Sequence, residues 1–162
     1  MALIVQKYGG TSVGTVDRIK NVARRVARYK AQGHQLVVVV SAMSGETNRL
    51  LGLAREITPE PDPRELDVVA ATGEQVTIGL LAIALNQIGV KARSYTGGQV
   101  RILTDSAFTK ARILAIDEAN MRRDLDDGNV IVVAGFQGVD DEGNITTLGR
   151  GGSDTTGPGP AS

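Results

Sequence analysis

Two uninterrupted apolar runs stand out in the pattern of hydrophobic and polar positions. They cover residues 36–40 and 130–134, and neither run alternates with polar residues. Such runs are typical of strands that are covered on both faces, as in parallel sheets with helices on either side. A shorter apolar run over residues 3–6 predicts another strand, which leads directly into Lys7 and a glycine pair. Each of the three predicted strands is followed by a glycine-containing turn.

A pattern of apolar residues with helical periodicity follows the first predicted strand. From Val16 to Ala27, apolar residues recur at intervals of three and four, and basic residues stand between them. This predicts an amphipathic helix that ends near Gly33. Its basic face is better interpreted as solvated than as a nucleic-acid surface, because the whole chain carries no net charge. A second helix is predicted over residues 50–57, and the prolines in residues 58–63 end it.

A long helical pattern then runs over residues 66–88 and closes at Gly89. Gly73 lies inside it, and a glycine costs about 1 kcal/mol in a helix interior. We therefore expect a break at Gly73 that presents Glu74 at the start of a second helical segment. Glu74 is expected to be buried or to face a cleft.

The second half of the chain predicts shorter elements. A strand is expected over residues 90–95, a turn at Gly97–Gly98, and a continuation of the strand over 100–103. Residues 111–116 fit a strand or a helix by periodicity alone, and we favour a strand. A helix over 117–127 should end at Gly128, and residues 140–144 should form a hairpin tip before the chain reaches Gly149.

The amino-acid composition narrows the class of protein. Many aliphatic residues and few aromatics indicate a tightly layered α/β protein, and 162 residues suffice for one domain with a sizeable core. The 18 basic and 18 acidic residues balance, so no net charge indicates nucleic acid or an anionic membrane as a partner. The absence of cysteine excludes disulfides and thiolate chemistry, and a cytoplasmic location is expected. The single histidine, His34, lies in a predicted turn, which argues against a histidine triad or metal site.

Two glycine clusters carry the candidate chemistry. Residues 149–156 place three glycines in four positions around Arg150 and Asp154, and residues 7–12 place a glycine pair after Lys7. Backbone amides of such clusters can approach a phosphate closely. Residues 9–14 have the spacing of the first half of a P-loop, but Thr15 and Val16 follow in place of the required lysine and hydroxyl residue. The Walker motif is therefore absent.

What remains is phosphoryl transfer that depends on positioning and electrostatics. The chain shows no evident general base. A carboxylate acceptor with a pKa near 4 needs none at pH 7, because it is already ionised. A carboxylate is therefore the expected phosphoryl acceptor, provided that the two glycine clusters meet in space.

At this point the motifs resemble a known family. The stretches KYGGTSVG at 7–14, VSAMSGET at 40–47, TGEQ at 72–75, GFQG at 135–138 and GRGGSDTT at 149–156 closely resemble the aspartate kinases of the amino-acid kinase superfamily. The resemblance covers about residues 2–156 in order. It implies a three-layer αβα sandwich with a mainly parallel central sheet, and ATP-dependent phosphorylation of the side chain of L-aspartate to 4-phospho-L-aspartate, the first step toward lysine, threonine, methionine and isoleucine.

The resemblance also implies site residues. Lys7 and Asp154 would be catalytic: Lys7 would neutralise the transferring phosphoryl group, and Asp154 would orient Lys7. The ATP phosphates would be bound by Lys7, Tyr8, Gly9, Gly10, Ser12 and Ser41. The substrate would be bound by Thr47, Glu74, Arg150, Gly151, Gly152, Ser153 and Asp154. Among these, Arg150 suits a bidentate grip on the α-carboxylate, Glu74 would pair with the ammonium group, and Ser41, Thr47 and Ser153 would complete the aspartate pocket. Mg²⁺ would arrive with ATP, and no dedicated protein metal site is expected.

Each residue also has a purely structural interpretation. Lys7 can be a surface lysine at a strand end, and Glu74 a favourable carboxylate at a helix start. Arg150 and Asp154 can pair with each other across a turn. Ser41 and Thr47 can be turn or cap residues. Only their joint occurrence favours a binding site.

The resemblance stops after residue 156. The family's domain continues with a helix and a second lobe that binds the nucleoside, and then with regulatory ACT domains. Here Pro158 and Pro160 cannot continue a helix interior, so residues 1–156 are interpreted as the N-terminal lobe and 157–162 as a linker-like tail. We expect this chain to be inactive alone, and to form homo-oligomers or need the missing lobe. The alternatives are a non-catalytic fragment that serves as an aspartate-binding or assembly module, and another carboxylate kinase such as an acetylglutamate or glutamate kinase.

Overall fold

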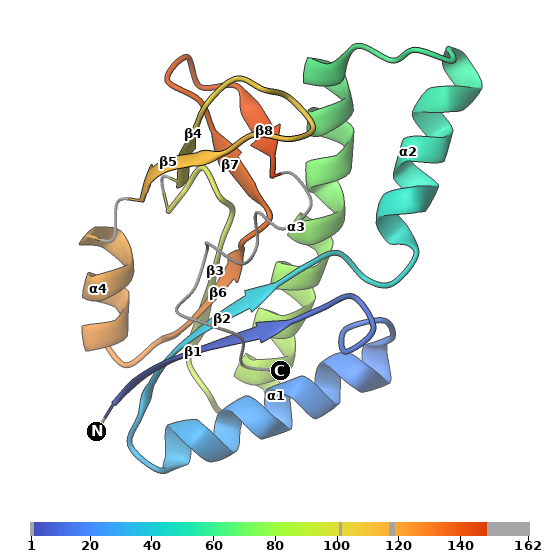
Figure 1. Cartoon of the computed structure of the whole chain (residues 1–162). Helices are drawn as coiled ribbons and strands as arrows, with labels where there is room; N and C mark the ends of the chain where they lie inside the picture. Colours follow the sequence, from blue (N-terminus) through green and yellow to red (C-terminus); the bar gives the residue numbers. More distant parts are fainter. Residues whose placement is uncertain (1, 101, 117–118, 149–162) are drawn as a thin grey trace.

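The computed structural model describes residues 2–100, 102–116 and 119–148, and Figure 1 shows their arrangement. In chain order the strands and helices are β1 Leu3–Tyr8, α1 Val16–Ala31, β2 Gln35–Val40, α2 Glu46–Ile57, α3 Pro63–Gln87, β3 Ala92–Tyr95, β4 Ile102–Thr104, β5 Ile113–Ile116, α4 Ala119–Asp126, β6 Val130–Ala134, β7 Gln137–Val139 and β8 Ile145–Thr147.

A parallel four-stranded sheet forms the centre of the fold. Its strand order is β1-β2-β6-β3, and every neighbouring pair is parallel. The register aligns Tyr8 with Val40 and Val40 with Ala134, which are the last residues of β1, β2 and β6. The loops that follow these three strands therefore leave the sheet side by side, at the edge where open parallel sheets bind ligands.

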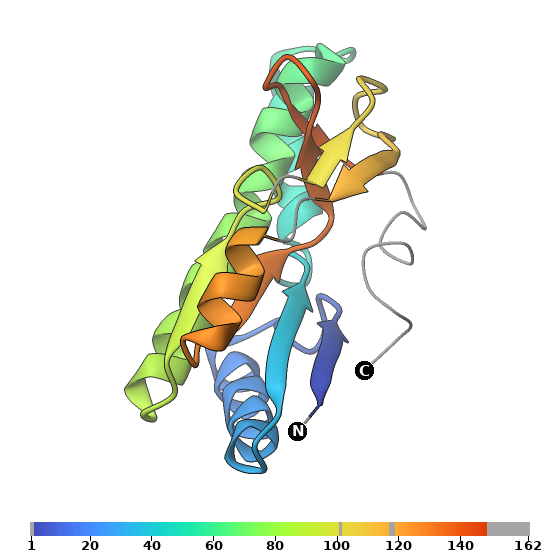
Figure 2. The ribbon, with the colours of Figure 1, turned by 90° about the vertical axis from the view of Figure 1, so that its left-hand side faces the viewer.

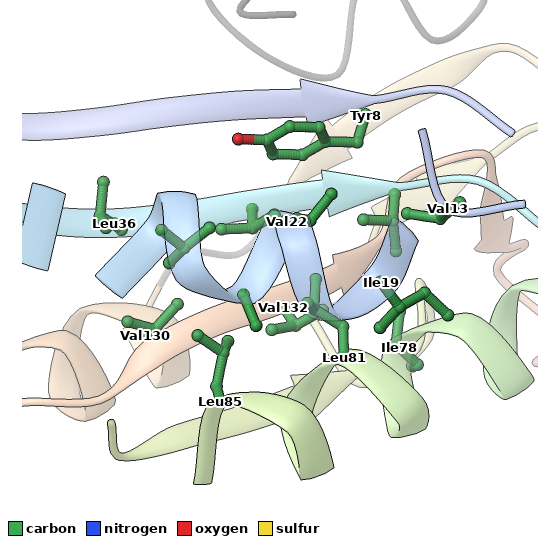
Figure 3. Close-up of a cluster of buried hydrophobic side chains, with 14 of the residues drawn as sticks. Tyr8, Val13, Ile19, Val22, Leu36, Ile78, Leu81, Leu85, Val130 and Val132 are labelled. Carbon is green, nitrogen blue, oxygen red and sulfur yellow. The ribbon is translucent and has the colours of Figure 1, made fainter. Parts of the chain in front are cut away.

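Helices cover both faces of this sheet. On one face, α1 and α3 pack on residues such as Leu36, Val130 and Val132, as Figure 3 shows. On the other face, Leu125 of α4 belongs to a second cluster with Val37 and Ile131. Alternate residues of β2 and β6 thus enter different clusters, which explains why these strands show no polar alternation. The three-layer α/β arrangement predicted from the sequence is confirmed.

A second sheet lies beyond the carboxyl end of the first, at the top of the molecule in Figures 1 and 2. Its order is β5-β4-β7-β8, with β4 and β7 parallel and the other pairs antiparallel. Residues 100–103 were expected to continue the strand that ends at Tyr95. That prediction is wrong, because the turn at 97–100 redirects the chain and β4 joins the second sheet. The predicted hairpin between β7 and β8 is confirmed.

The long helix α3 is continuous, so the predicted break at Gly73 is wrong. Gly73 is buried, and a Cβ atom there would lie 3.0 Å from the Cβ of Ala42 and 3.4 Å from Cδ1 of Leu50. The glycine therefore allows α3 to approach the loop after β2 and α2 closely, and this packing outweighs the helix-propensity cost. Glu74 lies in the interior of α3, which excludes its interpretation as a helix-start carboxylate.

By length and composition α3 would also suit a membrane span, since an 18-residue window has a mean hydropathy of 1.7. In the structure its residues Ile78, Leu81 and Leu85 belong to the cluster between α1 and the parallel sheet. One apolar face of α3 is thus packed into the protein core, whereas Val76 and Ile83 are exposed.

Candidate functional site

The loops after β1 and β2 are bonded to each other at the carboxyl edge of the sheet. The amide of Ser41 donates to the carbonyl of Tyr8 at 3.3 Å, and the amide of Ser44 donates to the carbonyl of Gly10 at 3.1 Å. A Cβ atom on Gly10 would lie 3.1 Å from the carbonyl oxygen of Ala42. The glycine at position 10 therefore permits the close approach of the two loops.

The helix α2 begins beside these loops (Figure 1). Its N-cap residue is Gly45, with φ +82°, and no side chain caps the helix. The N-terminus of a helix carries partial positive charge and unpaired amides, which favour an anion. Thr47 is the second residue of α2, so it does not act as the cap that was one interpretation of the sequence.

Two adjoining cavities lie at this edge. The first, which we call the loop cavity, has a volume of about 320 Å³ and is lined by Gly10, Ser41, Ala42, Met43, Ser44, Gly45, Thr47, Asn48, Glu74 and Phe136. The second, the helix cavity, has a volume of about 370 Å³ and is lined by Thr47, Leu51, Arg55, Leu66, Asp67, Ala70, Ala71, Glu74, Thr109, Phe136, Thr147 and Leu148. Both cavities share Thr47, Glu74 and Phe136, so Glu74 lies where the two adjoin.

Glu74 is the charged group most strongly affected by this environment. It is 6% exposed, and burial raises its pKa to about 8, although hydrogen bonds from the Gln137 side chain and the Phe136 backbone oppose the shift. The carboxyl group is therefore largely protonated at neutral pH in the protein alone. A cationic group placed beside it would favour its ionised form.

Asp67 lies seven residues before Glu74 on the same helix and is 1% exposed. Its carboxylate accepts hydrogen bonds from the Thr109 amide at 2.9 and 3.0 Å, the Thr147 amide at 2.9 Å and the Thr147 hydroxyl at 2.7 Å. Thr109 has φ +72°, an unusual value for a β-branched residue. Asp67 thus fastens α3 to the loop before β5 and to the end of β8.

Asp67 belongs to none of the motifs from which the site residues were predicted. The signal that could have found it is an acidic residue on the apolar face of a long helix, at a spacing of seven from Glu74. Two helical turns separate residues seven apart, so both carboxylates face the same side of α3. Both line the helix cavity.

The other predicted site residues differ in their exposure to solvent. Lys7 is half-buried near the end of β1, while Gly9 and Ser12 are exposed in the following loop. The Tyr8 side chain points into the core, where its hydroxyl donates to Oε1 of Gln6 at 3.0 Å and burial raises its pKa (Figure 3). Tyr8 can therefore contribute to this edge only through its backbone. Ser41 is half-buried and lines the loop cavity.

The predicted residues Arg150, Gly151, Gly152, Ser153 and Asp154 lie outside the described residues. The predicted meeting of Lys7 with Asp154 lies outside them as well. The described part of the site thus comprises the loops after β1, β2 and β6, the start of α2 and the middle of α3.

Comparison with known proteins identifies this architecture. The sequence profile of the amino acid kinase family matches residues 2–158. The chain belongs to the amino acid kinase family. Aspartokinase from Pseudomonas aeruginosa is 70% identical over 157 residues, which are 97% of this chain and 38% of that protein. The chain therefore spans about two fifths of the length of this relative.

Solved structures of other family members agree. The aspartate kinase from Synechocystis shares 48% identity with a TM-score of 0.78, over 95% of this chain and 25% of that one. Aspartokinase III from E. coli, in complex with aspartate and ADP, shares 25% identity with a TM-score of 0.82, over 96% of this chain and 45% of that one. The amino acid kinase fold predicted from the motifs is confirmed.

Proposed function

We propose that this chain provides the amino-acid and phosphate-side part of an aspartate kinase, which transfers the γ-phosphoryl group of ATP to the side-chain carboxylate of L-aspartate. The observation that carries the proposal is the position of Glu74, a buried carboxyl group between two adjoining cavities. Its pKa near 8 suits a partner that brings positive charge. The 70% identity to an aspartokinase supports aspartate as the substrate.

In this proposal the substrate lies across the two cavities. Its ammonium group pairs with Glu74, and its side-chain carboxylate points into the loop cavity toward Gly10 and Ser41. Thr47, which lines both cavities, is positioned to hydrogen-bond the substrate between these ends. Arg150 and Ser153 would bind the α-carboxylate and complete the pocket.

The phosphates of ATP would occupy the loop cavity. Its lining fits an anion, because the uncapped N-terminus of α2 and the backbone of the glycine-containing loops meet there. Gly9 and Ser12 would extend this surface, and Gly151 and Gly152 would add backbone donors. Mg²⁺, carried by ATP, supplies neutralising charge when it is bound. The nucleoside would bind to a further segment or chain.

The reaction needs no general base. An oxygen of the ionised substrate carboxylate forms a bond to the γ-phosphorus, and the bond from that phosphorus to the oxygen bridging to the β-phosphorus breaks. ADP leaves with the bonding electrons, and no proton is transferred. Lys7, oriented by Asp154, would stabilise the negative charge on the transferring group. The reaction would take place in the cytoplasm.

Calorimetric titration of the chain with L-aspartate tests the substrate assignment. The Glu74→Gln variant keeps the shape of the side chain and its acceptor oxygen but cannot become anionic. We expect it to bind L-aspartate at least ten times more weakly, since a buried charge-assisted bond is worth roughly 1.5–3 kcal/mol. Equal affinity of the variant and the parent would contradict the pairing of Glu74 with the ammonium group.

An ADP-release assay with L-aspartate and ATP tests the catalytic part of the proposal. Turnover by the chain that is lost in Lys7→Ala would support an enzyme. Binding of L-aspartate without turnover would instead support the alternative, a non-catalytic aspartate-binding module.

A further inference from the structure

Gln137 is the third residue of the GFQG motif and the first residue of β7, and the proposed function gives it no role. Its side chain is 3% exposed, and the amide makes three hydrogen bonds. Oε1 accepts from the Gly97 amide at 3.3 Å, while Nε2 donates to the Ala71 carbonyl at 3.0 Å and to Oε1 of Glu74 at 3.1 Å. A buried glutamine thus connects the turn after β3 with the interior of α3.

Two backbone groups determine which way the Gln137 amide faces. The Gly97 amide is a donor and requires the oxygen, whereas the Ala71 carbonyl is an acceptor and requires the nitrogen. In the reversed orientation, the amide nitrogen would face the Gly97 N–H group, which is also a donor. The amide oxygen would face the Ala71 carbonyl, which is also an acceptor. The nitrogen must therefore face Glu74, and both of its hydrogens are used.

This orientation has a consequence for Glu74. An amide nitrogen cannot accept a hydrogen bond, so Oε1 of Glu74 can only be an acceptor toward Gln137. Below its pKa, a proton on the other oxygen, Oε2, is favoured, because a carbonyl oxygen is a better acceptor than a hydroxyl oxygen. A donor held against a carboxyl group also favours the ionised form over the neutral form.

The backbone holds Gln137 firmly in this place. A Cβ atom on Gly97 would lie 2.2 Å from the carbonyl oxygen of Gln137, and one on Gly138 would lie 2.5 Å from the carbonyl oxygen of Ile102. Only glycine permits these approaches. The turn at 97–100 and β4 therefore back β7 directly and limit any movement of the Gln137 amide.

Other charged groups near Glu74 come from α2 and α3. Arg55 of α2 and Asp67 of α3 line the helix cavity with it. Glu46 of α2 packs beside Gly73, with its Cγ atom 3.6 Å from the position of a Cβ atom there, and is paired with Arg49. Burial raises the pKa of Glu74, and the hydrogen bonds that oppose this shift come from the Gln137 side chain and from the Phe136 backbone.

We infer that Gln137 is a positioning residue for Glu74: it holds one carboxylate oxygen from the protein side and favours the anion that receives the ammonium group of the substrate. The second part of this inference rests on the proposed function. The first part concerns the protein alone and can be tested without a ligand.

The Gln137→Met variant removes the donor with little change in volume. We expect the pKa of Glu74, followed through its side-chain carboxyl carbon by NMR on uniformly ¹³C-labelled chain, to rise by about one unit. The dissociation constant of L-aspartate should then rise roughly tenfold at pH 7, because the ionised fraction falls tenfold. At pH 9 the two proteins should differ only about twofold, because Glu74 is then at least half ionised in both. A merely structural role would weaken binding equally at all pH values.

The matched control is Thr146→Val in the same small sheet. Thr146 is fully buried and its hydroxyl lies 2.6 Å from that of Thr104, so the variant loses a buried hydrogen bond that involves neither Gln137 nor Glu74. It should leave the pKa of Glu74 and the pH profile of binding unchanged. The inference is overturned if Gln137→Met leaves the pKa within 0.3 units of the parent value, or if it raises the pKa without shifting the binding profile. A raised pKa in a chain that binds no L-aspartate supports the role of Gln137 and counts against the proposed function alone.

Discussion

At the scale of single residues, Glu74 shows how burial prepares a carboxyl group for a cationic partner. Its side chain lies between two cavities, yet it is almost inaccessible and keeps two protein donors. Desolvation outweighs these donors, so the proton stays on the group near neutral pH. A ligand ammonium would replace the missing solvation and drive the proton off. Under the proposed function, binding of the substrate is therefore linked to the release of a proton.

The same residue should make stability depend on pH. The pKa of Glu74 is about 8 in the folded protein and 4.5 for the reference group, so the folded state holds a proton that the unfolded state has lost between these values. Its stabilising contribution is complete below pH 4.5 and is lost as pH rises through 8. The free energy of unfolding should fall by up to about 1.4 kcal/mol per pH unit in this window.

Urea unfolding of the parent and of Glu74→Gln between pH 5 and 9 measures this contribution. The variant has no group to titrate at this position, so its stability should fall less steeply than that of the parent. Parallel profiles for the two proteins would show that Glu74 titrates near its ordinary pKa.

At the scale of elements, α3 organises the site. Its buried face packs on the parallel sheet, its N-terminal half lies beside α2, and Asp67 bonds to β8. Gly73 packs closely against the loop after β2. The helix therefore carries a poor helix former at a position where little room is left for a Cβ atom.

Two glycines of α3 should respond to alanine with opposite signs. Alanine at position 73 would bring a Cβ atom to 3.0 Å from the Cβ of Ala42, and the cost of overpacking should exceed the gain in helix propensity. We expect a loss of about 1 kcal/mol in the free energy of unfolding. Gly79→Ala is the control, since nothing lies within 4 Å of its added Cβ, and it should stabilise the protein by up to ~1 kcal/mol. Stabilisation by both variants would argue against close packing at Gly73.

At the scale of the whole molecule, the two sheets are joined end to end. Polypeptide passes directly from β6 to β7 through the short turn at 135–136, and the Asp67 carboxylate ties α3 to the second sheet. The cavities lie along this junction. The geometry of the site thus depends on how the second sheet is attached to the first.

Removal of the Asp67 carboxylate should loosen this attachment. Asp67→Ala leaves the donors on Thr109 and Thr147 without their acceptor, and we expect a loss of about 3 kcal/mol, because an unsatisfied buried donor costs roughly 1–3 kcal/mol. Hydrogen exchange should accelerate most in residues 102–111 and 137–147. The control is Glu65→Ala, which removes an exposed ion pair with Arg64 on the same helix and should change stability by less than about 1 kcal/mol. Uniform acceleration across both sheets would contradict a local role.

Much of the fold could be predicted from the sequence because it rests on local patterns. The apolar runs of β2 and β6, the period of α1, and the glycines at 33 and 128 with positive φ each carry their signal within a few residues. Glu74 was also predictable as buried or cleft-facing, since it is a charge within an apolar helix. The motifs identified the family because its ligand loops follow strands at fixed places in the chain.

The tertiary structure decided those features that depend on contacts between residues distant in sequence. The low helix propensity of Gly73 predicts a break in α3, but in the structure Gly73 packs closely against Ala42 and Leu50. Residues 100–103 have strand character, but the turn at 97–100, where Gly97 packs against Gln137, leads them into a second sheet. The bonds of Asp67 and Gln137 span 40 to 80 residues. Local sequence determines which elements form, because propensity and periodicity act over a few residues. Packing between distant elements determines which side chains they bring together.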